Sequence, residues 1–275
     1  DREKTDARDY LNSKGIAPGE SPIAVFQTGA AIESKKWPVD SFIKLGKKLV
    51  RENWRILITG APAEAQAARN IGEAIGERAV CTAGETTFRA AIANCSFAQA
   101  CVSGDTAMMH AAAGVGVRTF ALFGPTNPVE TGPWGEGHWI FSAPCERRPC
   151  FDYGCDCRSC LESVSPELVF RCMIDDAPPP DAGCTIQRTH CPENGDYSLE
   201  PVAGKVDAYI DDAASRLVLR FFEGENGDRK ITGESDACIE ESRQFGADLD
   251  RMIAALQQTI ATSQSSHIQQ FEQVK

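Results

Sequence analysis

The sequence contains no run of about 18 apolar residues, the length that a membrane-spanning helix needs. Residues 1–9 are charged and lack an apolar core, so they do not match a secretory signal peptide. The sequence has no excess of basic residues either. Its net charge is −11, and most of this negative charge falls after residue 175. These absences predict that the sequence has no membrane-spanning helix, and they argue against nucleic-acid binding.

The apolar residues that are present, 42% of 275, suffice for one large domain or two small ones. Short apolar runs typical of buried strands occupy residues 23–26, 55–58, 79–81, 98–102, 117–123 and 139–141. Helical spacing of apolar residues occurs over residues 38–50, 63–75, 86–94 and 166–174. This alternation predicts an α/β fold over residues 21–175, a parallel sheet covered on both faces, with ligands at the carboxyl ends of its strands.

The flanking segments differ in composition. Residues 1–20 predict a linker or a cut domain boundary, and residues 176–275 predict an acidic carboxyl-terminal extension of unknown role. Consecutive prolines at residues 178–180 favour a linker at its start. The extension is expected to hold a strand over residues 217–222 and an amphipathic helix over residues 239–260. It is therefore an α+β tail, and it shows no catalytic motif.

Residues 102–110 combine the end of a buried strand, a glycine turn and the start of a helix. Asp105 or Thr106 is expected to cap this helix through its side-chain oxygen. The remaining backbone N–H groups and the helix dipole favour an anion such as phosphate. Asp105 opposes a phosphate placed on it, so a hydroxyl group, as on a sugar, is its better partner. The stretch thus predicts a site for a sugar phosphate or a nucleotide sugar.

Five motifs then occur in order, namely Thr-Gly-Ala at 28–30, Lys-Lys-Trp-Pro at 35–38, Leu-Ile-Thr-Gly-Ala-Pro-Ala-Glu at 57–64, Ser-Gly-Asp-Thr-Ala-Met-Met-His at 103–110 and Ala-Leu-Phe-Gly-Pro-Thr at 121–126. This series resembles the carboxyl-terminal domain of glycosyltransferase family 9, the lipopolysaccharide heptosyltransferases, over roughly residues 20–175. The resemblance implies a GT-B architecture, in which two Rossmann-like, doubly wound domains face an active-site cleft. Ala107 departs from the glycine that is usual in the family, which bears on the identity of the donor.

The resemblance also implies an activity, the inverting transfer of heptose from ADP-heptose to a lipopolysaccharide core acceptor, without a cofactor. In the family the acceptor and the catalytic base belong to the amino-terminal domain. Only about twenty residues precede the first predicted strand, so we expect this chain to bind the donor and to be inactive in transfer without that domain. The catalytic residues are therefore unknown. The implied location is cytoplasmic, with peripheral association at the inner face of the inner membrane as the alternative.

The motifs give a predicted donor-binding set. In it, Lys35 corresponds to a family lysine that contacts the donor phosphates, whereas the neighbouring Lys36 is expected at the surface. Glu64 is expected either to accept from ribose hydroxyls or to stabilise the first turn of its helix. The whole set is Thr28, Gly29, Lys35, Thr59, Gly60, Glu64, Gly104, Asp105, Thr106, Ala107, Met108 and His110.

Several residues in or beside the motifs have a structural role as an alternative. His110 lies four residues after Thr106, so it is expected on the same side of the helix, either at the donor or as a packing residue. Trp37 is expected to pack at a strand–helix junction. Thr126 and Asn127 either close over the sugar or form a proline-flanked turn.

Cysteines cluster in the middle of the sequence, at Cys145, Cys150, Cys155, Cys157 and Cys160. Zinc bound by Cys145, Cys150, Cys155 and Cys160 is one interpretation, although structural zinc sites usually have two short-spaced pairs. Disulfides and free thiols are the others.

Other functions remain open from the sequence. The nearest is a transferase that uses a different nucleotide sugar. A second is a non-catalytic module that binds nucleotide sugars, and a third is an interaction protein built around a metal site and the acidic tail.

Overall fold

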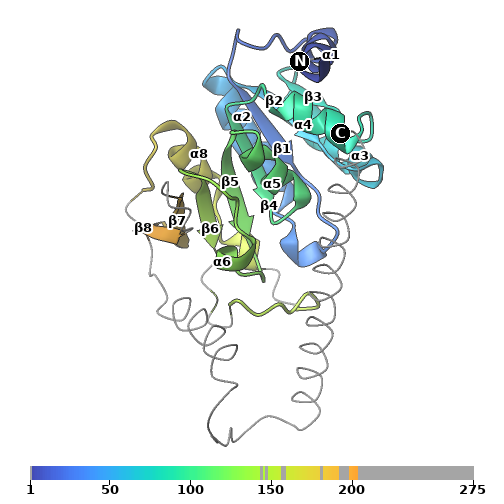
Figure 1. Ribbon diagram of the computed structural model, residues 1–275. Helices are drawn as coiled ribbons and strands as arrows, with labels where there is room; N and C mark the ends of the chain where they lie inside the picture. The colour runs from blue at the N-terminus through green and yellow to red at the C-terminus, as the bar shows by residue number, and fades with distance from the viewer. Residues whose placement is uncertain are drawn as a thin grey trace, which may run out of the picture. The chain divides into compact units, whose positions relative to one another are not determined.

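The computed structural model describes residues 2–142, 145, 148–155, 159–179, 182–191 and 198–203. Its centre is an eight-stranded sheet in the order β3-β2-β1-β4-β5-β6-β7-β8 (Figure 1). All pairings from β3 to β6 are parallel, and β7 and β8 are antiparallel additions at one edge. The strands are β1 (Ile23–Gln27), β2 (Arg55–Thr59), β3 (Ala79–Cys81), β4 (Ala100–Gly104), β5 (Arg118–Phe123), β6 (Trp139–Ser142), β7 (Thr185–His190) and β8 (Ser198–Ala203).

Helices cover both faces of this sheet. The α-helices are α1 (Arg2–Ser13), α2 (Val39–Arg51), α3 (Ala65–Ile75), α4 (Phe88–Cys95), α5 (Ala107–Gly114), α6 (Pro128–Thr131), α7 (Ser159–Glu162) and α8 (Pro166–Ile174), and short 3-10 turns are η1 (Glu33–Lys35) and η2 (Pro62–Glu64). One core cluster joins the sheet to α2, α3 and α8, and a second joins it to α1, α4 and α5. The predicted Rossmann-like, doubly wound fold is confirmed, and its strand order reverses between β1 and β4.

The strands are apolar on both sides because both sides face helices. In β1, Ala24 and Phe26 enter the cluster with α2 and α3, whereas Ile23 and Val25 enter the opposite one. All four side chains are at most 1% exposed. A strand of this kind reads as one continuous apolar run rather than as an alternating pattern, which is why the sequence pattern located it.

The predicted linker at residues 1–20 contains a helix instead. Helix α1 buries Ala7 and Leu11, which lie four residues apart and therefore on one helical face. Leu11 and Ile16 are fully buried in the cluster with α4 and α5. The high charge of the segment hid this helix, because two apolar positions among solvated charges give a weak periodic signal.

Beyond residue 175 the same sheet continues. β7 pairs with β6, and Ile186 packs fully buried in the main core. The strand and the amphipathic helix predicted at residues 217–222 and 239–260 lie outside the described residues. Within the part of the chain that the structure describes, no helix is long and apolar enough to cross a membrane.

Candidate functional site

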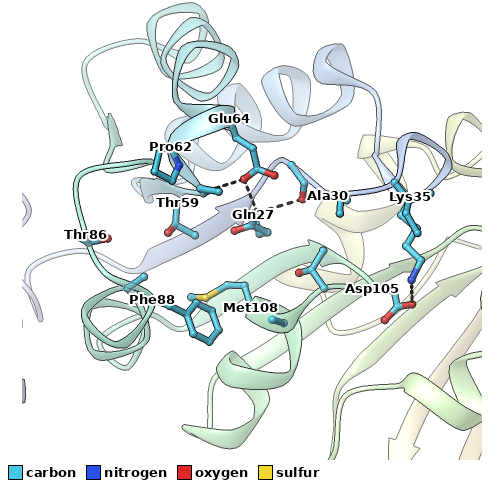
Figure 2. Close-up of a pocket in the computed structure, with 18 residues that line it drawn as sticks. Gln27, Ala30, Lys35, Thr59, Pro62, Glu64, Thr86, Phe88, Asp105 and Met108 are labelled. Atoms are coloured by element: carbon cyan, nitrogen blue, oxygen red, sulfur yellow. Dashed lines mark hydrogen bonds and ion pairs between the residues drawn. The ribbon is translucent and has the colours of Figure 1, made fainter.

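A cavity of about 470 Å³ opens at the carboxyl ends of β1, β2 and β4, beside the start of α5 (Figure 2). This is where the strand order reverses, the usual ligand position in an open α/β sheet. Its volume falls in the range of small-molecule sites. The predicted donor-binding residues that line it are Gly29, Lys35, Thr59, Gly60, Glu64, Asp105, Thr106, Ala107 and Met108.

Three predicted residues lie elsewhere. Thr28 lines a neighbouring hollow of about 390 Å³ instead. Gly104 lies behind the backbone of Lys35 rather than at the cavity wall. His110 is exposed on α5, because this helix begins at Ala107 and turns His110 away from the cavity.

Several lining residues were missed by the sequence analysis. Gln27 is the last residue of β1, and the rule that ligands gather at strand ends would have found it. Phe88 opens α4 and remains 54% exposed at the cavity rim, facing Met108 in Figure 2. Thr86 and Pro62 complete this side. No local pattern marks Phe88, since an aromatic residue in a helix usually packs in the core.

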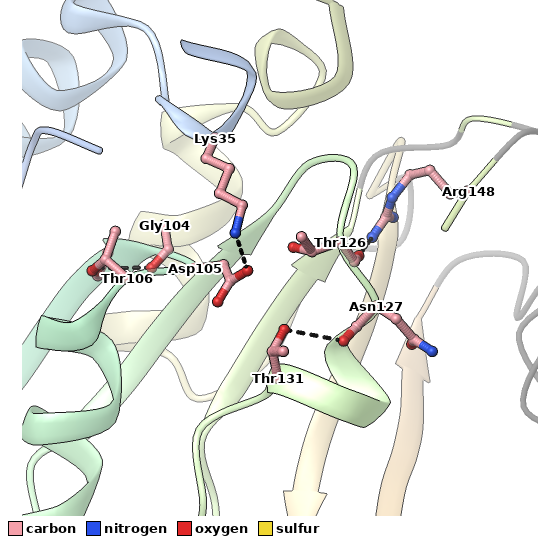
Figure 3. Close-up of polar contacts among 9 residues, drawn as sticks. Lys35, Gly104, Asp105, Thr106, Thr126, Asn127, Thr131 and Arg148 are labelled. Atoms are coloured by element: carbon pink, nitrogen blue, oxygen red, sulfur yellow. Dashed lines mark hydrogen bonds and ion pairs between the residues drawn. The ribbon is translucent and has the colours of Figure 1, made fainter. Parts of the chain in front are cut away.

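The cavity holds one ion pair. The Lys35 ammonium lies 2.7 Å from Oδ2 of Asp105, and the two side chains are only 16% and 8% exposed (Figure 3). The ammonium also lies 5.7 Å from the centre of the Tyr153 ring, a cation–π contact. Lys35 thus has two partners from distant parts of the sequence, one of them in the cysteine-rich segment.

Two glycines allow the segment that carries Lys35 to pack closely against the sheet. A Cβ atom at Gly104 would lie 2.6 Å from the carbonyl oxygen of Lys35, and one at Gly124 would lie 2.6 Å from that of Ser34. Gly104 is the last residue of β4 and Gly124 directly follows β5, so both lie at the carboxyl ends of strands. Only glycine lets the backbone of η1 approach so closely, which fixes the point from which Lys35 reaches into the cavity.

A buried arginine holds the loop after β5. Arg148 is 6% exposed and donates from Nε to the carbonyl oxygen of Gly124 at 2.5 Å. Its Nη2 donates to the carbonyl oxygen of Thr126 at 3.3 Å and to Ser142 Oγ at 3.2 Å. The sequence analysis did not single out Arg148, because an arginine in a polar, cysteine-rich stretch is normally exposed.

The loop after β5 forms the expected proline-flanked turn, and its closure over a sugar stays a prediction. Asn127 accepts from the N–H of Val129 at 3.1 Å and so caps α6. Thr126 is 3% exposed, and its Oγ1 has no hydrogen-bond partner among the described residues. Trp37 packs on Phe42 and donates to the carbonyl oxygen of Val164 at 2.9 Å, which confirms its predicted packing role.

Glu64 closes the opposite side of the cavity. Its Oε2 accepts from the Ala61 N–H at 2.8 Å and from Gln27 Nε2 at 3.3 Å. Cβ atoms at Gly29 or Gly60 would come within 2.0 and 2.7 Å of its carboxylate oxygens. The two glycines of the motifs therefore make room for this carboxylate, and Glu64 serves both its short turn and the cavity.

The start of α5 carries no side-chain cap, which corrects the prediction for Asp105 and Thr106. Asp105 is taken by Lys35, and Thr106 Oγ1 instead lies 2.9 Å from Ser103 Oγ. The first N–H groups of the helix are therefore left for another acceptor. An anion at the cavity wall would satisfy them.

The cysteine prediction resolves only in part. Within the residues that the structure describes, no three cysteines, histidines or carboxylates gather as a metal site, and Cys157 lies outside them. Of the cysteines in the cluster, Cys145 and Cys150 are free thiols. Elsewhere, burial raises the pKa of the Cys172 and Cys184 thiols to about 12, so neither is a thiolate at neutral pH.

The family model that describes glycosyltransferase family 9 (heptosyltransferase) matches residues 1–160. The chain belongs to this family. It is 32% identical over 139 residues to lipopolysaccharide heptosyltransferase 1 of Pseudomonas aeruginosa, covering 48% of this chain and 38% of that protein. It is 35% identical over 123 residues to lipooligosaccharide heptosyltransferase 2 of Haemophilus influenzae, covering 42% and 35%.

Solved family 9 structures share the fold. A glycosyl transferase family 9 protein from Veillonella parvula superposes with a TM-score of 0.57 at 19% identity, covering 62% of this chain and 50% of that one. The E. coli ADP-heptose lps heptosyltransferase II gives 0.53 at 22%, covering 64% and 51%. This family 9 chain thus spans about half of those structures, and less than half of the two curated relatives.

Proposed function

We propose that residues 21–175 form the donor-binding domain of a heptosyltransferase and that the cavity beside α5 takes an ADP-sugar, ADP-heptose in the first instance. The observation that carries this is the meeting of Lys35, Asp105 and the uncapped start of α5 in one cavity of a family 9 chain. The E. coli relative is named for ADP-heptose, which supports the same donor.

In this proposal each part of the donor has a partner among the residues of the cavity. The first N–H groups of α5 and the Lys35 ammonium would hold the diphosphate. The Glu64 carboxylate, fixed by Ala61 and Gln27, would accept from ribose hydroxyls. The exposed ring of Phe88 at the rim offers a flat face to the adenine. Donors aimed at the diphosphate also stabilise the charge that it gains as the leaving group, without a metal.

We assign the acceptor and the catalytic base to the other half of the family architecture. The carboxylates at the cavity wall already have partners, since Asp105 pairs with Lys35 and Glu64 accepts two hydrogen bonds. In the proposed inverting displacement, a base across the cleft removes the proton of a lipopolysaccharide core hydroxyl, which attacks the anomeric carbon as the diphosphate leaves. Residues 21–175 by themselves would bind the donor without transferring it, and we propose that they act at the cytoplasmic face of the membrane.

Calorimetric titration with ADP and ADP-heptose tests the proposal. Lys35→Ala should weaken the binding of both ligands by roughly tenfold or more, since a charge-assisted contact to phosphate contributes about 1.5–3 kcal/mol. Lys36→Ala is the matched control, because Lys36 is the next residue, is exposed and pairs with Glu33. Absence of ADP binding to the folded wild-type chain, or equal losses in the two variants, would refute the donor site.

Ala107 supports a second candidate, a transferase for another nucleotide sugar. It is the first residue of α5, lines the cavity and stands where the family usually has glycine. A methyl group there narrows the approach to the diphosphate and its sugar. Tighter binding of a UDP- or GDP-sugar than of ADP-heptose in the same titrations would favour this alternative.

A further inference from the structure

The charge balance of the cavity is unfavourable to the ligand that it is proposed to bind. Among the described residues that line it, the ionisable side chains are Lys35, Glu64 and Asp105, one cation and two carboxylates. A nucleoside diphosphate brings further negative charge. As long as Lys35 remains paired with Asp105, its charge is already compensated, and Glu64 repels the ligand.

The ion pair is well placed to compete. Lys35 Nζ and Asp105 Oδ2 lie 2.7 Å apart, and both side chains are largely shielded from solvent. Shielding strengthens an ion pair relative to one in water. Asp105 directly precedes Thr106 and the first turn of α5, so a diphosphate on the N–H groups of that turn would lie beside this carboxylate. Both anions would then be within reach of the same ammonium.

We propose that Asp105 and the diphosphate compete for the Lys35 ammonium, so that Asp105 lowers the affinity of the site for a nucleoside diphosphate and favours its release. The inference rests on the proposed function. When the donor binds, Lys35 exchanges Asp105 for phosphate oxygens. After transfer, the Lys35–Asp105 ion pair forms again. The product nucleotide is then bound only by the neutral N–H groups of α5. Asp105 is thus a positioning residue that acts through Lys35.

The surroundings of Lys35 allow this exchange. Gly104 and Gly124 fix the backbone of the Ser34–Lys35 segment, so the ammonium moves by rotation of a long side chain rather than by loop displacement. The Tyr153 ring contacts the ammonium only through the cation–π interaction. Near the Ser34–Lys35 segment, two hydroxyl oxygens, Ser34 Oγ and Thr126 Oγ1, are buried without a hydrogen-bond partner among the described residues. Two buried hydroxyl groups near Lys35 therefore have hydrogen-bonding capacity left for a further partner.

The test is calorimetric titration of ADP into the wild-type chain, Asp105→Asn and Glu33→Gln. Asp105→Asn keeps the size of the side chain and frees Lys35, so it should bind ADP about tenfold more tightly than wild type. Glu33→Gln also removes one negative charge, from the segment that carries Lys35, but Glu33 pairs with Lys36. This control should therefore stay within about twofold of wild type. Adenosine, which lacks the diphosphate, should bind all three proteins equally.

A second measurement is made on the wild-type protein and uses a variant only to assign the signal. Lysines of the wild-type protein are dimethylated with a carbon-13 label, and the signal of Lys35 is assigned by its loss in Lys35→Arg. Saturation with ADP should shift this signal, whereas adenosine should leave it in place. ADP binding without a shift, or without tightening in Asp105→Asn beyond that in Glu33→Gln, overturns the competition alone. No ADP binding to wild type overturns the proposed function and this inference together.

Discussion

Replacing Gly104 by alanine tests whether the reach of Lys35 into the cavity depends on close backbone packing. The new Cβ would lie 2.6 Å from the carbonyl oxygen of Lys35, whereas ordinary contact begins near 3.4 Å. The two must therefore separate by about 0.8 Å. Backbone strain does not contribute, because the φ angle of Gly104 lies outside the left-handed region. The perturbation is thus a single clash against a single backbone oxygen.

The expected cost follows from overpacking. A methyl group forced against a packed backbone typically lowers the free energy of unfolding by about 1–3 kcal/mol. A shift of η1 relieves part of this clash. The shift also moves Lys35 away from the start of α5. ADP affinity should therefore fall by roughly fivefold to tenfold. Gly124→Ala presses on Ser34 of the same segment, again at 2.6 Å. Because both variants displace one segment, their effects should be less than additive.

Urea unfolding and ADP calorimetry on the same samples measure both effects. Gly114→Ala is the matched control, since a Cβ at this last residue of α5 meets nothing within 4 Å. It should change stability by at most about 1 kcal/mol, in the stabilising direction, and leave ADP affinity unchanged. The reasoning fails if Gly104→Ala behaves like Gly114→Ala, or if it loses stability with full ADP affinity.

Two further predictions concern stability. Leu11→Ala should lower the free energy of unfolding in urea by about 2–5 kcal/mol, because Leu11 is fully buried and anchors α1; a loss below about 0.5 kcal/mol would show that α1 is not docked. Burial lowers the pKa of His138, whose Nδ1 accepts from the Thr119 N–H at 3.1 Å. As the pH falls through about 6.5, the unfolded chain therefore binds a proton at this histidine before the folded chain does, which favours unfolding. Wild type should therefore lose stability relative to His138→Gln between about pH 8 and about pH 5.5, and a constant difference in urea unfolding would contradict this.

The site was predictable where its residues follow strands. Thr59 directly follows an apolar run, and Gly29 and Asp105 each lie three residues after one. Parallel strands bring such ends to one edge of the sheet. The roles within the site were less predictable. Asp105 was expected to cap α5 and instead pairs with Lys35, a partner seventy positions earlier in the chain. A capping pattern is local, whereas an ion pair depends on which loops the fold brings together.

Arg148 and Phe88 show the same limit from the other side. Nothing in the local sequence distinguishes Arg148 from the other arginines near it, yet burial against the loop after β5 makes it the support of that loop. Phe88 is of a residue type that usually packs in the core, but its side chain remains exposed at the cavity rim. In both cases the role depends on how far the side chain is buried, and the periodicity of the sequence does not predict this burial.

The sequence by itself determined the α/β class and the position of the site, because apolar runs and motif order depend on neighbouring residues and on hydrophobic periodicity. It also carried the motifs that relate the chain to family 9. Only the tertiary structure decided which groups meet. It paired Lys35 with Asp105, set Gly104 and Gly124 against one backbone segment, and turned His110 away from the cavity. These contacts join residues far apart in the chain, so their distances exist only after the sheet has formed.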